Sequence, residues 1–94
     1  MNNLSPLKKE MLVPNDLGIH ARAATKIAQL AQHAKSNVWI IKEGQKANAS
    51  SVLDILMLAC YQGTEITLTI ENSIDLNILE DISSLVENGF GELA

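Results

Sequence analysis

The hydrophobic and polar positions of the chain repeat with two different periods, and each period predicts a different kind of element. Apolar side chains at every second position are typical of a half-buried strand. The clearest case is the segment in which Ile66, Leu68 and Ile70 alternate with polar residues. This pattern, with the apolar run that begins at Val38, predicts strands at residues 7–13, 38–41, 46–49 and 64–70.

Three further segments carry apolar residues at helical spacing. They predict helices at residues 20–35, from Ser50 or Ser51 to about residue 61, and from about residues 72–75 to residue 87. Either serine can cap the second helix, Gly63 is placed to end it, and Leu56 is expected on its buried face. The resulting order is β-α-β-β-α-β-α. Because each strand has one apolar face, we expect an α+β fold with one antiparallel-type sheet and helices stacked on one face.

Composition narrows the class of protein. The 94 residues suit a single domain spanning residues 1–94, and 47% hydrophobic residues with 3% aromatics predict a core of aliphatic side chains. A formal net charge of −4 argues against a nucleic-acid partner. The lone Cys60 excludes an internal disulfide and a multi-cysteine zinc site, and it suits a reducing cytoplasm. The first residues contain no long apolar run, so we expect neither a signal peptide nor a membrane span.

The candidate chemistry lies at the start of the first helix. His20 falls between loop and helix, where free backbone N–H groups favour an anion and disfavour a positively charged ring. A neutral ring nitrogen there can act as a nucleophile toward a phosphoryl group. Arg22, the only arginine, adds a permanent cation with forked donors, and Gly18 supplies backbone freedom. On His20 and Arg22 alone, however, a solvated histidine and a surface arginine are the more common explanation.

Longer stretches of the sequence favour the interpretation of His20 as a phosphoryl acceptor. The stretch GIHARAAT at residues 18–25 resembles the active-site segment of HPr, the histidine-containing phosphocarrier family of the bacterial phosphoenolpyruvate-dependent phosphotransferase system. The stretch GQKANASSVLDILML at residues 44–58 resembles the second characteristic segment of that family, with Ser51 at its serine position. The stretch QGTEITLTI at residues 62–70 resembles its last strand.

This resemblance implies an open-faced sandwich with a four-stranded antiparallel sheet in order 1-4-2-3 and three helices on one face. It implies that enzyme I phosphorylates His20 on Nδ1, that Arg22 stabilises the phosphate, and that an EIIA-type protein receives the group. It also implies no metal and no cofactor. The protein would be a cytoplasmic participant in phosphoryl transfer with a transient phosphohistidine, rather than an enzyme acting on a small substrate by itself. No dimerisation seam is visible in the sequence, so we expect a monomer.

Several positions depart from the family pattern. Ala23 stands where proline is usual, and Ser50 stands where lysine is common. Lysines of sugar-transport members are replaced at four positions, by Gln29, Gln32, Gln45 and Asp54. Steering toward acidic partners should therefore be weaker than in sugar-transport members. The stretches DILML and NGFGE resemble the nitrogen-related branch of the family, so sugar transport and a regulatory phosphorelay both stay open.

Ser51 has two compatible interpretations. It can be a helix cap, and it can be a regulatory site for an HPr kinase/phosphorylase, where a phosphate would add negative charge to the surface that faces partners. Val52, Leu53 and Gly18 are candidates for partner docking, with Leu53 the best candidate for an exposed side chain. Two alternatives to a phosphocarrier are a regulatory binding module of the same fold and a small structural domain that never carries phosphate.

Overall fold

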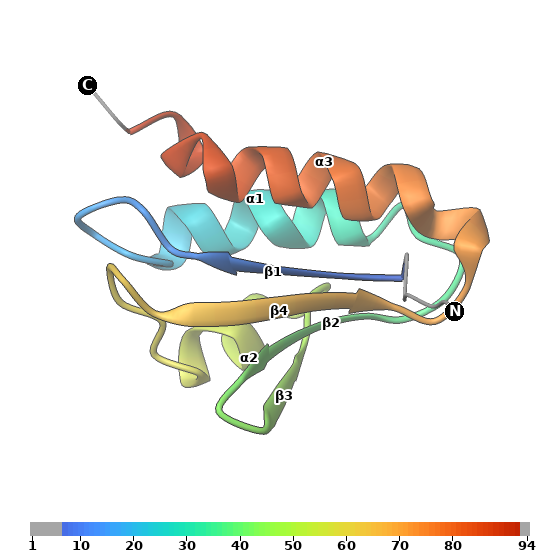
Figure 1. The fold of residues 1–94 in the computed structure, drawn as a ribbon, viewed down its shortest axis with the longest axis horizontal. Coiled ribbons are helices and arrows are strands. Elements are labelled where there is room, and N and C mark those ends of the chain that lie inside the picture. Colours follow the sequence, from blue (N-terminus) through green and yellow to red (C-terminus); the bar gives the residue numbers. More distant parts are fainter. Residues whose placement is uncertain (1–6, 93–94) are drawn as a thin grey trace.

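The computed structural model describes residues 7–92, and its four strands form one antiparallel sheet in the order β1-β4-β2-β3 (Figure 1). The strands are β1 Lys8–Leu12, β2 Val38–Lys42, β3 Gln45–Asn48 and β4 Glu65–Ile70. Strand β4 lies between β1 and β2 and is antiparallel to both. The predicted strands and the strand order implied by the HPr resemblance are confirmed. The predictions for residues 1–6 and 93–94 lie outside the described residues.

Three helices pack with this sheet. They are α1 Ala21–Ala31, α2 Val52–Met57 and α3 Leu76–Glu87, and short 3₁₀ turns precede and follow α3 at η1 Ser73–Asp75 and η2 Gly89–Gly91. Helices α1 and α3 run side by side along the sheet, while α2 contacts α1 and β3 (Figure 1). In residues 7–92 no helix is both long enough and apolar enough to cross a membrane.

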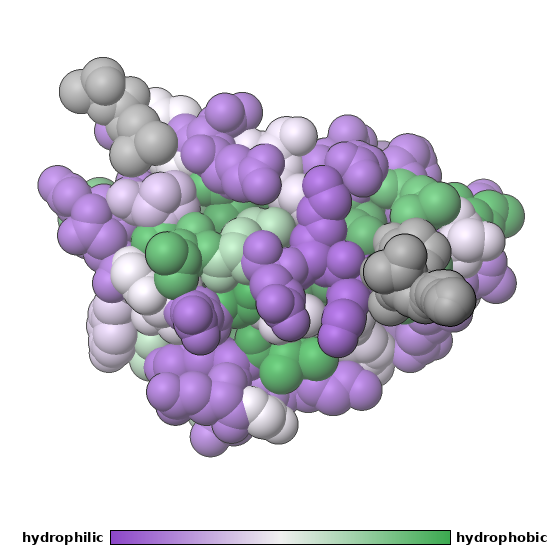
Figure 2. All heavy atoms as spheres, viewed as in Figure 1, coloured by the Kyte–Doolittle hydropathy of each residue, from purple (hydrophilic) through white to green (hydrophobic). Residues whose placement is uncertain are grey.

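The core lies between the sheet and the helices. The alternating strand residues Ile66, Leu68 and Ile70 are buried, as the period of two predicts. On the helix side, Ala23 and Ala24 are fully buried, and their small side chains let α1 approach the sheet closely. Polar residues cover most of the face shown in Figure 2, with apolar residues visible between them.

Helix α2 ends earlier than predicted. It stops at Met57 rather than near residue 61, and Gly63 lies well beyond its end. Ala59 adopts a left-handed conformation with φ 56°, which the helix cannot continue through. The Lys42 ammonium donates to the carbonyl oxygens of Leu58 and Ala59 at 2.9 and 3.0 Å, and so satisfies acceptors that a helix end leaves free.

Helix α1 also ends earlier than predicted, at Ala31 rather than residue 35. The carboxylate of the buried Asp75 accepts hydrogen bonds from the backbone N–H groups of Lys35 and Ser36, at 2.8 and 2.9 Å. These bonds give the loop after α1 the partners that a longer helix would have supplied, and they fix the loop to η1.

The loop before α1 lies against the segment after α2. The N–H of Ile19 donates to the carbonyl oxygen of Cys60 at 2.9 Å. Gly18 has a φ of 64°, and a Cβ atom placed on it would lie 2.4 Å from the same carbonyl oxygen. Cys60 itself is buried, and burial raises the pKa of its thiol, as expected for a small buried hydrophobe.

We predict that Gly18→Ala destabilises the fold more than Gly63→Ala. Both glycines have positive φ, but the Cβ at Gly63 would meet nothing within 4 Å. Gly63→Ala should therefore cost only the conformational strain, about 1–3 kcal/mol. Gly18→Ala should cost about 1–3 kcal/mol more, because the added methyl overlaps the Cys60 carbonyl. Urea unfolding of both variants measures the difference, and equal midpoints would contradict the close contact.

Candidate functional site

His20 is the N-cap residue of α1. Its backbone is extended, with φ −81° and ψ −178°, and its carbonyl accepts the N–H of Ala24 at 2.8 Å, which begins the helical hydrogen bonding. The N–H groups of residues 21–23 therefore have no carbonyl partner within the helix. The prediction that His20 lies at the junction of loop and helix is confirmed. His20 is therefore the residue next to the free N–H groups of the first helical turn.

The ring of His20 is held at one nitrogen. Its Nε2 forms a hydrogen bond with the Glu92 carboxylate oxygen Oε2, and both side chains are about a quarter exposed, at 27% each. Within residues 7–92, Nδ1 of His20 has no hydrogen-bond partner. Because a neutral imidazole carries one proton, a carboxylate at Nε2 favours the proton there and leaves the lone pair on Nδ1.

Arg22 lies in the first turn of α1, two residues after His20. Its side chain is exposed, and in the described part of the chain it forms no hydrogen bond and no ion pair. The structure thus brings His20 and Arg22 to the same helix end without joining them. The guanidinium is free to meet an anion that approaches this end of the helix.

Two further residues complete the site, and sequence reasoning missed both. Asn15 is buried, with 1% exposure, and its amide donates to Glu92 Oε1 at 2.8 Å and to the carbonyl of Gly18 at 2.9 Å. Glu92 lies 72 positions from His20 in the sequence. No local periodicity connects residues so far apart. The one signal in the sequence is that Asn15 and Glu92 lie in stretches of turn-forming residues, PNDLG and NGFGE.

The hydrogen bond with His20, and next the hydrogen bond from Asn15, hold the pKa of the Glu92 carboxyl below its ordinary value. A carboxyl with a lowered pKa in the folded protein favours folding at pH values above its ordinary pKa. That contribution declines as the pH falls and is lost once the pH passes below the lowered pKa. At neutral pH Glu92 is therefore an anion beside the histidine ring.

The remaining predicted site residues lie at the start of α2 and in the loop before α1. Ser51 is the N-cap of α2, and its Oγ accepts the N–H of Asp54 at 3.2 Å, so the capping role is confirmed. Val52 is half-buried and Leu53 is exposed, as expected for Leu53. Gly18 is buried against Cys60, so it shapes this surface through the loop backbone and offers no exposed side chain.

Further exposed apolar side chains belong to the chain segments next to these positions. Leu17, Met57 and Tyr61 are as exposed as Leu53, with values between 68% and 75% for the four. The loop that carries Leu17 contacts the segment that carries Tyr61, because Gln62 donates to Pro14 and Asp16 in addition to the contacts of Cys60. We call Leu17, Leu53, Met57 and Tyr61 the exposed apolar surface. Of these four, sequence reasoning identified only Leu53.

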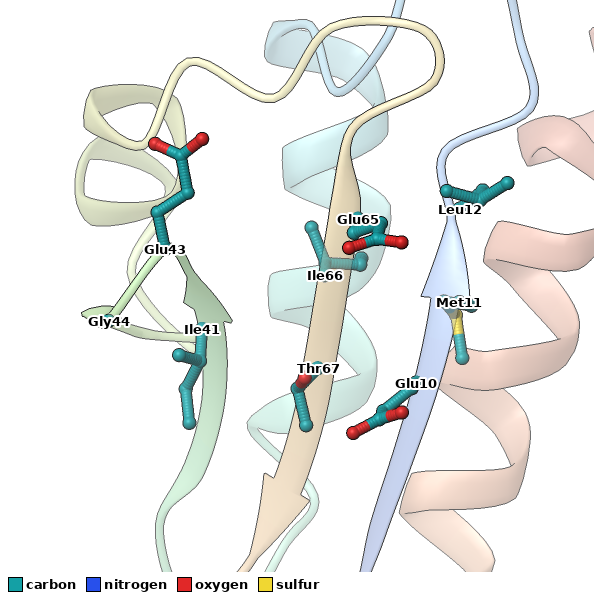
Figure 3. A pocket seen from close by; sticks show the side chains of 9 residues that line it. All are labelled: Glu10, Met11, Leu12, Ile41, Glu43, Gly44, Glu65, Ile66 and Thr67. Atoms are coloured by element: carbon teal, nitrogen blue, oxygen red, sulfur yellow. The ribbon is translucent and has the colours of Figure 1, made fainter.

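A separate groove crosses the open face of the sheet, with the helices behind it (Figure 3). Glu10, Glu43 and Glu65 line it together with apolar residues of β1, β2 and β4, and none of the predicted site residues lines it. Across residues 7–92 there is no group of three His, Cys, Asp or Glu side chains that could hold a metal ion.

Comparisons with known proteins point to one family. The family model for the phosphotransferase-system HPr component phosphorylation site matches residues 7–88. The chain is 35% identical to phosphocarrier protein HPr of Neisseria meningitidis over 86 residues, covering 92% of this chain and 97% of the relative. It is 38% identical to phosphocarrier protein NPr of Shewanella violacea over 89 residues, covering 95% and 98%.

Solved structures show the same fold. HPr of Thermoanaerobacter tengcongensis superimposes with a TM-score of 0.86 at 30% identity, covering 93% of this chain and 98% of that one. Crh of Bacillus subtilis, solved as a domain-swapped dimer, superimposes with a TM-score of 0.69 at 29% identity, covering 100% and 99%.

Proposed function

The chain belongs to the HPr family of phosphocarrier proteins, and we propose that it takes a phosphoryl group from enzyme I onto Nδ1 of His20 and passes it to an EIIA-type protein. One observation carries the assignment to this atom. His20 caps α1 with Nε2 bonded to Glu92, and its Nδ1 has no partner in residues 7–92. The lone pair that can attack phosphorus is therefore on Nδ1.

The transfer itself is a balanced exchange. The Nδ1 lone pair of His20 forms a bond to phosphorus while the bond from phosphorus to the donor's histidine nitrogen breaks, and that electron pair returns to the donor ring. In the onward step, an EIIA-type histidine nitrogen forms a bond to phosphorus while the bond from phosphorus to Nδ1 breaks, and that electron pair returns to the His20 ring. Since both sides are phosphohistidines, the reaction is reversible and needs no metal or cofactor from this chain.

Stabilisation of the phosphoryl oxygens comes from the start of α1. Phosphoryl transfer requires mainly positioning and charge stabilisation from a protein. The N–H groups of residues 21–23 and the exposed guanidinium of Arg22 supply donors at the helix end that already favours an anion. Ala23, where the family usually has proline, is buried in the first turn and maintains the helix there.

We propose that partners dock on Val52, Leu53 and the loop at Gly18, together with the other residues of the exposed apolar surface. Exposed large apolar side chains gathered on one surface are typical of a protein-binding site. The positions at which sugar-transport members often carry lysines hold Gln29, Gln32, Gln45 and Asp54, and all four are exposed. Association with acidic partners should thus depend less on charge steering and change less with salt. We propose that the protein acts in the cytoplasm as a monomer.

A regulatory binding module is the second candidate function. The absence of lysines at those four positions favours it, because sugar-transport partners of the family are acidic. The similarity to an NPr protein at 38% identity also favours a regulatory branch over sugar uptake. In this role the phosphorylation state of His20, and of Ser51 where an HPr kinase/phosphorylase is present, would control the binding of other proteins.

We predict that His20→Ala abolishes labelling by enzyme I and phosphoenolpyruvate, because it removes the acceptor nitrogen. The side chain of His20 does not cap α1, so the variant should keep its fold. His33→Ala is the matched control, since the side chain of His33 is exposed and forms no hydrogen bond or ion pair in the described residues. Mapping of the acid-labile phosphate measures the result. Labelling that persists in His20→Ala would place the acceptor elsewhere.

We predict that Arg22→Gln slows transfer by about 10- to 100-fold, because a hydrogen bond to a charged group contributes about 1.5–3 kcal/mol. The control is Lys35→Gln, which removes the same charge beyond the opposite end of α1. Rapid-quench measurement of phosphoryl transfer from enzyme I compares the two. Equal rates would leave Arg22 without a role.

We predict that Ser51→Asp weakens docking to enzyme I, because it adds a negative charge at the start of the helix that carries Leu53. Ser51→Asn is the matched control, since asparagine caps a helix as well as serine and adds no charge. Titration calorimetry with enzyme I measures both affinities. If Ser51→Asp and Ser51→Asn bind equally well, a phosphate at Ser51 would not act through charge.

A further inference from the structure

We propose that Glu92 is a positioning residue for phosphoryl transfer: its carboxylate fixes the tautomer of His20 and stabilises the positive charge that the ring acquires when Nδ1 is phosphorylated. This inference rests on the proposed function and deepens it. The observation behind it is the hydrogen bond between His20 Nε2 and Glu92 Oε2.

The segment after α3 is shaped to bring Glu92 to this place. Gly89, Phe90 and Gly91 have φ values of 62°, 58° and 78°, and three left-handed residues in succession turn the chain sharply. The ring of Phe90 is buried, with 1% exposure, and its carbonyl accepts a hydrogen bond from the Lys26 ammonium at 3.1 Å. The end of α3 and the start of α1 lie at the same end of the molecule (Figure 1). The turn therefore reaches the phosphoryl acceptor directly.

The carboxylate is held at both oxygens. Oε2 meets the histidine ring, while Oε1 accepts from the amide of Asn15 at 2.8 Å. Asn15 is buried, and the same amide nitrogen donates to the carbonyl of Gly18, so Asn15 joins Glu92 to the loop that carries His20. With one oxygen fixed to that loop, the other keeps a constant direction toward the ring.

The chemistry assigns a use to this arrangement. In the neutral ring the proton stays on Nε2, bonded to Glu92, and the lone pair stays on Nδ1. When Nδ1 bonds to phosphorus and the donor's bond to phosphorus breaks, the His20 ring becomes a cation that still carries its proton on Nε2. Glu92 is then an anion hydrogen-bonded to that cation, as the aspartate of a catalytic triad is to its histidine. The added phosphate is bonded to the other ring nitrogen, away from the carboxylate.

A purely structural role would be to anchor the segment after α3. Such a role predicts that losing Glu92 lowers stability and leaves the ring of His20 and the transfer rate unchanged. Glu92→Gln and Glu92→Ala separate the possibilities. Glutamine has no charge and keeps one oxygen, which can accept from Nε2 while its NH₂ group replaces the oxygen that faced Asn15, whereas alanine removes the charge and both oxygens. Glu87→Gln is the control, because it removes the same charge from an exposed side chain that forms no hydrogen bond or ion pair in residues 7–92.

The test combines ¹⁵N spectra of the His20 ring with the rate of transfer from enzyme I. We expect the wild type and Glu87→Gln to show the Nε2-protonated tautomer, Glu92→Gln largely to keep it, and Glu92→Ala to show a mixture. We expect Glu92→Gln to take up the phosphoryl group about 5- to 20-fold more slowly than Glu87→Gln, since the group that accepts the hydrogen bond from Nε2 no longer carries a negative charge.

Two results would overturn the proposal: ring spectra of Glu92→Ala identical to those of the wild type, or a transfer rate of Glu92→Gln equal to that of Glu87→Gln. A failure of the proposed function looks different, because the wild type itself would then take no label. In that case the role of Glu92 in transfer fails as well, while the ¹⁵N spectra still decide whether Glu92 sets the tautomer.

Discussion

The position of His20 depends on one close contact between two backbone segments that are distant in the sequence. Ile19 donates to the carbonyl of Cys60, and Gly18 lies so close to that carbonyl that no Cβ would fit. Cys60 can face this loop because α2 ends at Met57 and Ala59 turns the chain through a left-handed conformation. The early end of the six-residue helix α2 thus determines where the loop before α1 lies, and the position of this loop determines the position of His20.

The site around that ring separates opposite charges between its two nitrogens. The donors of the first turn of α1 and the guanidinium of Arg22 belong to the helix end where a phosphate would bind, and both favour an anion. The carboxylate of Glu92 lies at Nε2 instead, where it accepts a hydrogen bond from the ring N–H. A carboxylate placed among the helix donors would compete with phosphate for them. Placed at the far nitrogen, it would stabilise the ring in the phosphohistidine state that we propose.

Sequence reasoning succeeded where the signal is local. Alternation predicts the strand that holds Ile66, Leu68 and Ile70, and the position of His20 at the helix start follows from the loop residues before it and the alanines after it. It failed for the end of α2, because the carbonyl oxygens there accept hydrogen bonds from Lys42, a residue of strand β2. It failed for Glu92 for the same reason: the contact with His20 joins residues 72 positions apart through a turn whose direction depends on the burial of Phe90. Tertiary contacts of this kind leave no period in the sequence.

The exposed apolar surface affects how a phosphate on Ser51 would control the docking that we propose. Where lysines steer a partner, attraction acts over about a Debye length, roughly 8 Å at physiological salt. Gln29, Gln32, Gln45 and Asp54 cannot provide that attraction, so the docking that we propose would depend on the burial of side chains such as Leu53 and Met57, which acts only on contact. A doubly charged phosphate on Ser51 would then be buried against apolar groups with no lysine at the neighbouring Ser50 or Asp54 to pair with it. Its desolvation would oppose docking even in the absence of long-range repulsion. Negative charge at Ser51 should therefore inhibit docking at high salt almost as strongly as at low salt, which repulsion alone would not do.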